Sequence, residues 1–138
     1  MTAVRAPRWE LTRHASELGM AQLGPGAEVP GWALAGQPAA FRSAQRTDDE
    51  LTVICAWADI PAGVTAVGPF HAFSIDGPLD HSLIGVLAGL LTPLAGAEVS
   101  VLAQSTYNTD WILVPTDQTA ETVRVWTSAG HTVREGAA

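Results

Sequence analysis

The sequence contains no lysine, and its seven arginines face fourteen acidic residues, which leaves a formal net charge of -7. The arginines are scattered along the chain and form no basic stripe. Neutralisation of phosphates by Lys and Arg supplies most of the affinity of proteins for nucleic acids. The composition therefore argues against a nucleic-acid partner.

Cysteine and long apolar runs are also scarce. Cys55 is the single cysteine, so a disulfide within the chain is excluded, and the N-terminus has no apolar segment of signal-peptide length. The most apolar stretch, residues 83–94, is interrupted by Gly85, Gly89, Thr92 and Pro93 and is too short to span a bilayer. These features predict a cytoplasmic protein without a membrane segment.

Motifs for catalysis, metals and cofactors are missing as well. The four histidines and Cys55 show no spacing typical of metal ligands, and no phosphate-binding loop or nucleophile motif is present. Cys55 lies in an apolar stretch, which predicts a buried and inert thiol. We therefore expect no metal, no cofactor and no enzymatic activity. A small enzyme that uses His81 and Asp80 is the alternative, because a fold alone does not exclude catalysis.

What the chain does have is apolar material, at 47% of its residues, and this is enough for a core. In the first half we expect a strand at residues 9–14, a short helix at 17–23, and a loop over 24–38 with a helical turn near Trp32. A hairpin of strands 40–45 and 51–57 follows, joined by the polar turn 47–50. Residues 59–68, with Pro61 and Gly63, read as a linker.

The second half has clearer patterns. Strands are expected at residues 70–75, 99–105, 111–115 and 131–134. A first helix begins after Asp80 as its N-cap, buries Leu83, Val86, Leu87, Leu90 and Leu94 on one face, and ends at Gly96, with a bend at Pro93. A second helix covers 117–129 and ends at Gly130. The resulting order, βαββαβ, predicts an α+β ferredoxin-like unit whose two helices cover one face of an antiparallel sheet.

An internal repeat links the two halves. Residues 44–47 and 51–54 resemble 103–106 and 111–114, with one gap in the alignment, and both pairs read as strand, polar turn, strand. We therefore divide the chain into a degenerate N-terminal unit, residues 1–62, and a complete C-terminal unit, residues 63–138.

Three stretches carry a resemblance to a known family: FRSAQRTDDELTVIC, FSIDGPLDHSLIGVLAGLLTPLAGAEVSVLAQSTYNTDWILVP and TSAGHTV. They resemble the paired ACT-domain proteins of the CASTOR-like amino-acid sensor type, in particular small bacterial members. The resemblance covers residues 30–133 and implies two ACT-like units that regulate and do not catalyse. His81, Ile84 and Asn108 depart from the family pattern, so the identity of a ligand is not carried over.

The candidate site lies where the first helix of the complete unit faces the following hairpin. We expect the N–H groups of His81, Ser82 and Leu83 to hold a carboxylate. Asp110, or else Asp80, would pair with an ammonium group, and we favour Asp110 because Asp80 is used as the cap. The full predicted set of ligand-binding residues is Gly77, Pro78, Leu79, Asp80, His81, Ser82, Leu83, Gly85, Ser105, Thr106, Thr109 and Asp110.

Simpler readings of the same residues stay open, since capping explains Asp80 and Ser82 and turn chemistry explains residues 106–110. The expected function is binding of an amino acid or similar metabolite at the junction of the two ACT-like units of a regulatory protein, as a homodimer or with an unidentified protein partner. The alternative is a ligandless ACT-type module for protein–protein interaction.

Overall fold

The computed structural model describes residues 7–137, so residues 1–6 of the predicted first unit and Ala138 of the second lie outside the described part. Its elements, in chain order, are β1 (Glu10–Leu23), α1 (Gly31–Leu34), β2 (Ser43–Arg46), β3 (Leu51–Ala56), the 3-10 turn η1 (Trp57–Asp59), β4 (Thr65–Ile75), α2 (Val86–Gly96), β5 (Leu102–Ser105), β6 (Asp110–Pro115), the 3-10 turn η2 (Thr116–Gln118), α3 (Thr119–Ser128) and β7 (Thr132–Glu135).

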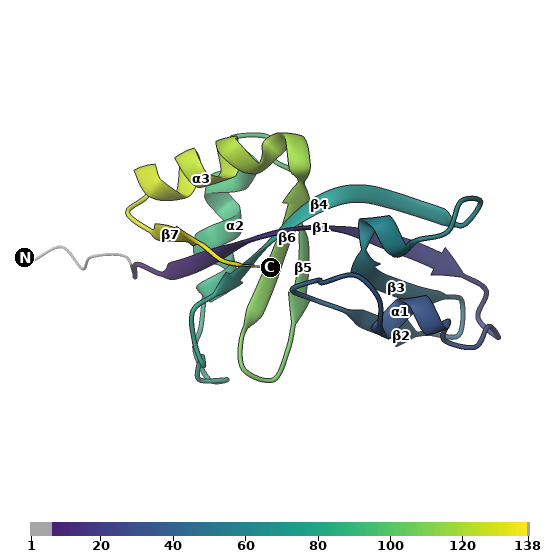
Figure 1. Ribbon diagram of the computed structural model, residues 1–138. Coiled ribbons are helices and arrows are strands. Elements are labelled where there is room, and N and C mark those ends of the chain that lie inside the picture. Colours follow the sequence, from purple (N-terminus) through teal and green to yellow (C-terminus); the bar gives the residue numbers. More distant parts are fainter. Residues whose placement is uncertain (1–6, 138) are drawn as a thin grey trace, which may run out of the picture.

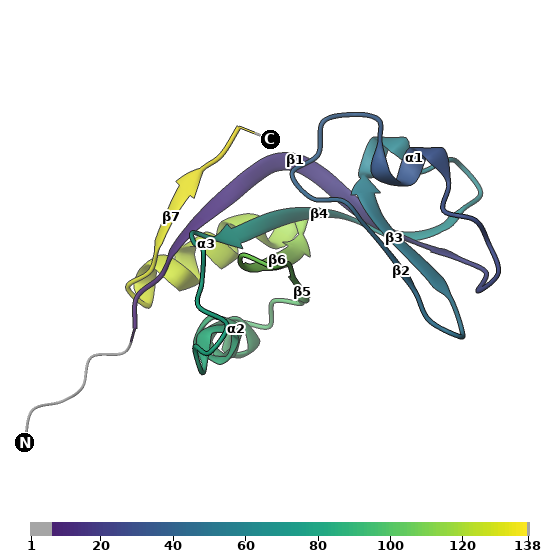
Figure 2. The ribbon, with the colours of Figure 1, turned by 90° about the horizontal axis from the view of Figure 1, so that it is seen from below.

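The strands form one seven-stranded sheet in the order β2-β3-β1-β4-β6-β5, with β7 paired to β1. All neighbours are antiparallel except β1 and β7, which are parallel. Figure 1 shows β1 and β4 running through the length of the molecule, with α2 and α3 at one end and α1 at the other, and Figure 2 shows the sheet arching between these ends. The two long strands therefore tie both halves into one body.

The second half confirms the predicted ferredoxin-like fold. It runs β4-α2-β5-β6-α3-β7, the order expected from the sequence. One feature was not predicted: the start of β1, Glu10–Arg13, lies between β4 and β7 and pairs with both. The sheet of this half is completed by a strand from the beginning of the chain.

The first half repeats the order with smaller helices. It runs β1-α1-β2-β3-η1-β4, and its strands lie in the order β2-β3-β1-β4. Here α1 has four residues and η1 has three. This is a reduced ferredoxin-like arrangement, and the boundary between units at residues 62 and 63 stays a prediction.

The main core lies between the sheet and the two larger helices. Val86, Leu90 and Leu94 of α2 are buried at helical spacing against Phe73, and Trp126 of α3 is fully buried with its ring edge-on to Phe73, at 5.0 Å between ring centroids. The Trp126 indole N–H donates to the Leu90 carbonyl at 2.9 Å, which satisfies its polar atom in the core. This packing fixes α2 and α3 on the sheet.

Three sequence-based predictions of elements are wrong. Residues 17–23 form the second part of β1 and no helix, because β3 and β4 pair with this segment from both sides. The expected linker 59–68 ends earlier, since β4 begins at Thr65. The first helix of the complete unit begins at Val86, about one turn later than expected.

Candidate functional site

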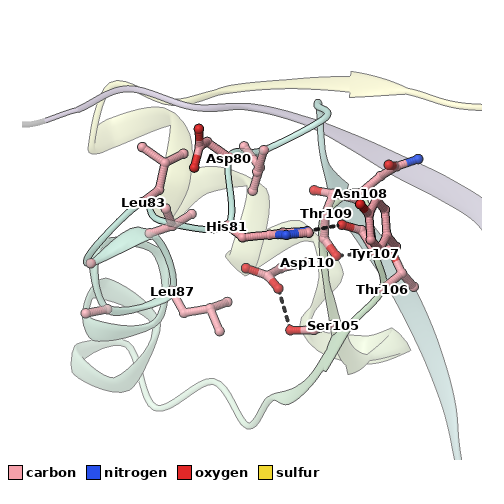
Figure 3. A pocket seen from close by; sticks show the side chains of 14 residues that line it. Asp80, His81, Leu83, Leu87, Ser105, Thr106, Tyr107, Asn108, Thr109 and Asp110 are labelled. Carbon is pink, nitrogen blue, oxygen red and sulfur yellow. Dashed lines mark hydrogen bonds between the residues drawn. The ribbon is translucent and has the colours of Figure 1, made fainter.

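An open cavity of about 440 Å³ lies between the segment that leads into α2 and the turn of the β5–β6 hairpin. Figure 3 shows the two walls facing each other, with Leu83 and Leu87 on the side of α2 and Asp110 and Ser105 on the side of the hairpin. Nine of the twelve predicted residues line it: Leu79, Asp80, His81, Leu83, Gly85, Ser105, Thr106, Thr109 and Asp110. The remaining three, Gly77, Pro78 and Ser82, do not.

Sequence reasoning missed five residues of the lining: Val86, Leu87, Ala88, Tyr107 and Asn108. Tyr107 and Asn108 were read only as turn residues, although a turn that faces a helix start exposes each of its residues to the space between them. Val86, Leu87 and Ala88 were missed because the helix was predicted to begin too early.

The predicted role of Asp80 as the N-cap of the helix is wrong. Its carboxylate Oδ1 accepts hydrogen bonds from the Ser82 N–H at 2.8 Å and the Ser82 hydroxyl at 2.6 Å, and the Leu83 N–H donates to the Asp80 carbonyl at 3.1 Å. This is a local turn ahead of the helix. The N–H groups of Ser82 and Leu83 are thereby used, so the carboxylate cradle predicted at His81, Ser82 and Leu83 is wrong.

The helix start that was predicted at residues 81–83 lies at Val86 in the structure. Gly85 stands at the N-cap position with a φ of 80°, which favours glycine, and no side chain caps the helix. The first N–H groups of a helix have no partner inside it and carry a partial positive charge. Since Gly85, Val86, Leu87 and Ala88 line the cavity, its positive pole lies here.

The hairpin supplies the opposite pole. Asp110 is half-buried, and its Oδ1 accepts a hydrogen bond from the Ser105 hydroxyl at 2.6 Å. The turn between them is closed by the Thr106 N–H, which donates to the Thr109 carbonyl at 2.8 Å. The Thr109 hydroxyl donates to the Ile75 carbonyl at 2.6 Å, which anchors the turn to the end of β4. The carboxylate of Asp110 is thus held in place.

Two contacts join the walls. The His81 ring donates from Nε2 to the Tyr107 carbonyl and lies edge-on to the Tyr107 ring at 4.9 Å between centroids. The Leu79 N–H donates to the Asn108 carbonyl at 2.8 Å. Gly77 is needed beside this bond, because a Cβ there would lie 2.8 Å from the Leu79 nitrogen. Figure 3 shows His81 reaching from the α2 side to the hairpin.

Hydrogen bonding affects the charge state of the Asp80 carboxyl group. Hydrogen bonds from the Ser82 hydroxyl and then the Ser82 N–H lower the pKa of the Asp80 carboxyl below its ordinary value. The carboxylate is therefore charged at neutral pH. Within the described range 7–137, no group of three His, Cys, Asp or Glu side chains is arranged to hold a metal ion.

Other functional suspects lie away from the cavity. Cys55 is fully buried in β3, as predicted, and burial is the main cause that raises the pKa of its thiol. No helix in residues 7–137 has the length and apolar character needed to cross a membrane.

Comparison with known proteins agrees with this fold. Residues 66–126 match the family model described as the ACT domain, and residues 16–63 match a second model described as an N-terminal domain. No curated protein sequence matches the chain. The narrower CASTOR-like resemblance stays a prediction.

Solved structures show how far the likeness extends. A protein from Agobacterium tumefaciens is 28% identical with a TM-score of 0.87, over 96% of this chain and 97% of that one. A protein of unknown function from Vibrio cholerae, described as a possible transport protein, is 16% identical with a TM-score of 0.67, over 86% and 89%. The regulatory subunit of aspartate kinase from Thermus flavus is 13% identical with a TM-score of 0.60, over 87% and 96%. The two more distant similarities concern the fold alone.

Proposed function

We propose that this chain is a regulatory module that binds an amino acid or a similar small metabolite in the cavity between α2 and the β5–β6 hairpin. The observation that carries the proposal is the pair of opposed poles in one cavity of an ACT fold. The uncapped start of α2 suits a carboxylate, and the Asp110 carboxylate suits an ammonium group. An α-amino acid carries both groups.

We also propose that the module catalyses no reaction. His81 donates from Nε2 to the Tyr107 carbonyl, and the Ser105 hydroxyl donates to Asp110 without a histidine beside it, so the lining residues form no Ser–His–Asp arrangement. A bound ligand would instead act by pulling the two walls together, and so alter how the protein packs on a second copy or on a partner.

A ligandless interaction module is the second candidate, and exposed apolar side chains at the rim favour it. Tyr107, which lines the cavity, is 83% exposed, and Ile84, which lies in the chain between the lining residues Leu83 and Gly85, is 97% exposed. Exposed apolar groups in one place are typical of contact surfaces. In this case the cavity rim would contact protein and metabolites would have no effect.

A thermal-shift screen against the twenty amino acids separates the two candidates. A ligand at about a hundred times its dissociation constant adds about 2.7 kcal/mol, or on the order of 5–15 °C for a chain of this size. Asp110→Ala should abolish the shift. Asp48→Ala, in the exposed turn of the other hairpin, is the matched control and should retain it. If no amino acid shifts the unfolding temperature, metabolite binding is wrong and the interaction module is favoured.

A further inference from the structure

In the described part of the chain, the first half of the fold has only the 3-10 turn η1 where the second half has α3. In the second half, β6 is followed by η2 and by the ten residues of α3, whose Trp126 is fully buried. In the first half, β3 is followed by the three residues of η1, and the chain then passes through residues 60–64 into β4. Figure 1 shows the short helix of this end beside the longer helices of the other. The sheet beside η1 is therefore covered by less of the chain.

Trp57, the first residue of η1, lies over this part of the sheet. Its ring rests on two glycines, because a Cβ on Gly19 of β1 would lie 2.4 Å from the ring carbon Cε3, and a Cβ on Gly68 of β4 would lie 2.9 Å from the same atom. The ring is thus seated by its neighbours, yet Trp57 is 37% exposed. Tryptophan is enriched among the residues that carry the binding energy of protein interfaces. A ring fixed at the surface in this way suits a contact with a partner.

Two cavities adjoin at Trp57. One has a volume of about 360 Å³ and is lined in part by Glu17 and Trp57, and the other has about 470 Å³ and is lined in part by Gly68 and Thr116. Their linings meet at two places, since the Thr116 hydroxyl donates to Glu17 Oε2 at 2.9 Å and the Trp57 ring rests on Gly68. We call the pair of cavities the seam groove, and its principal residues are Glu17, Trp57, Asp59, Gly68, Thr116 and Asp117.

The charged residues that line the seam groove are all acidic: Glu17, Asp59 and Asp117. The ion pairs within residues 7–137 join other side chains, so none of these three carboxylates is paired with an arginine there. Asp59 is held in place, because its Oδ2 accepts the Gln37 N–H at 2.8 Å and a Cβ on Gly36 would lie 2.4 Å from this oxygen. The groove therefore presents negative charge beside an exposed indole ring.

A basic peptide segment matches this combination of groups. Carboxylates attract cations, and the face of an indole ring binds a guanidinium group by stacking and by a cation–π interaction. A small molecule with one cation would fill one of the two cavities, whereas carboxylates in both cavities suit cations that are spaced along one chain. The net charge of -7 favours the approach of such a segment from a distance.

We propose that the seam groove docks a basic segment of a protein partner, with an arginine side chain stacked on Trp57 and paired with Glu17 or Asp59, and a second cation beside Asp117. The seam groove shares no lining residue with the cavity between α2 and the β5–β6 hairpin, so this inference goes beyond the proposed function and does not depend on metabolite binding. It gives the module a surface through which a partner is contacted.

Calorimetric titration of the full chain with a model peptide tests the charge of the partner. The probe is a hexapeptide with blocked termini in which arginine alternates with alanine. Its control carries citrulline, the uncharged isostere, in place of each arginine. We expect the arginine peptide to bind at least about tenfold more tightly than the citrulline peptide. Equal affinities, or no binding by either peptide, would overturn the proposal.

Variants of the chain test the assigned place. Glu17→Gln and Asp59→Asn, combined in one protein, retain acceptor oxygens and remove both charges, and should weaken binding of the arginine peptide by about tenfold. Trp57→Leu should weaken it by about two- to fivefold, as expected for a cation–π contact at an exposed site. Asp48→Asn is the matched control, because it removes a carboxylate in the exposed turn of the β2–β3 hairpin, and should leave the affinity within about twofold.

The unfolding temperature without peptide shows which variants remain folded. If the combined variant does not fold, Glu17→Gln alone, at an exposed side chain, should weaken binding by about two- to threefold. A folded groove variant that binds the arginine peptide as tightly as the parent protein, or an equal loss in Asp48→Asn, would contradict the assignment. The groove variants should keep any thermal shift caused by an amino acid, so failure of this proposal and failure of the proposed function are distinguishable.

Discussion

At the scale of residues, the polar side chains of the core differ in their surroundings from those of the cavity. His71 and His131 are buried, and each uses its Nδ1, the first with the Thr119 hydroxyl at 2.7 Å and the second as acceptor of the Trp9 N–H at 3.0 Å. Asp110 and His81, by contrast, line an open cavity. The buried histidines therefore belong to the packed interior, whereas Asp110 and His81 belong to the cavity of the proposed function.

A pH dependence of stability follows from His131. Burial, and then the charge of Arg8, lower the pKa of its imidazole below the ordinary 6.5, so the folded state favours the neutral ring. The unfolded chain binds a proton more readily, so the free energy of unfolding should fall as the pH decreases below about 6.5 and should not depend on this group above it. Burial and the charge of Arg13 lower the pKa of His71 in the same direction, against the opposite influence of Glu17 and Glu135.

Urea denaturation between neutral and mildly acidic pH measures this effect. His131→Gln keeps an acceptor for the Trp9 N–H and removes the titration, so its stability should decline less over the same range. Identical slopes for the variant and the parent protein would show that His131 does not contribute.

At the scale of elements, sequence patterns located most strands and helices but misplaced their ends. The strand predicted at residues 70–75 lies within β4, and the apolar spacing of Val86, Leu90 and Leu94 located α2, whereas Leu83, which was predicted on the same helix face, precedes the helix and is exposed. The start of α2 was misplaced because an aspartate bonded to an N–H two residues later occurs both in turns and in helix caps. Asp80 and Ser82 form a turn. Because the sequence does not distinguish a turn from a helix cap here, the predicted carboxylate-binding site was placed about one turn too early in the chain.

Two glycines in different elements should respond in opposite ways to alanine. Gly89 lies inside α2, and a Cβ added there would meet no atom within 4 Å, so Gly89→Ala should stabilise the protein by about 0.5–1 kcal/mol. Gly19 lies in β1 under the Trp57 ring, where a Cβ would overlap the ring carbons, so Gly19→Ala should destabilise it by about 1–3 kcal/mol. Denaturant titration of both variants checks the pair, and equal signs would contradict the packing described for Trp57.

At the scale of the whole molecule, the sequence predicted the ferredoxin-like order of elements. It did not predict that a strand from the beginning of the chain joins the sheet of the second half. The pairing of Glu10–Arg13 with β7 joins segments more than a hundred residues apart, and no local pattern encodes such a partner. The helix predicted at residues 17–23 was wrong for the same reason, since β3 and β4 decide its conformation. Most of the predicted site residues line one cavity, because the two segments that contain them adjoin elements with strong local patterns.

The central claim also belongs to this scale: the proposed ligand binds in the cavity between α2 and the β5–β6 hairpin, and the β2–β3 hairpin of the first half binds none. An NMR titration of the uniformly labelled protein with a mixture of the twenty amino acids tests it most directly. We predict that amide shifts change at residues 79–88 and 105–110 and stay unchanged at residues 24–30 and 46–51 of the first half. Changes confined to other parts of the chain, or no changes at all, would contradict the claim.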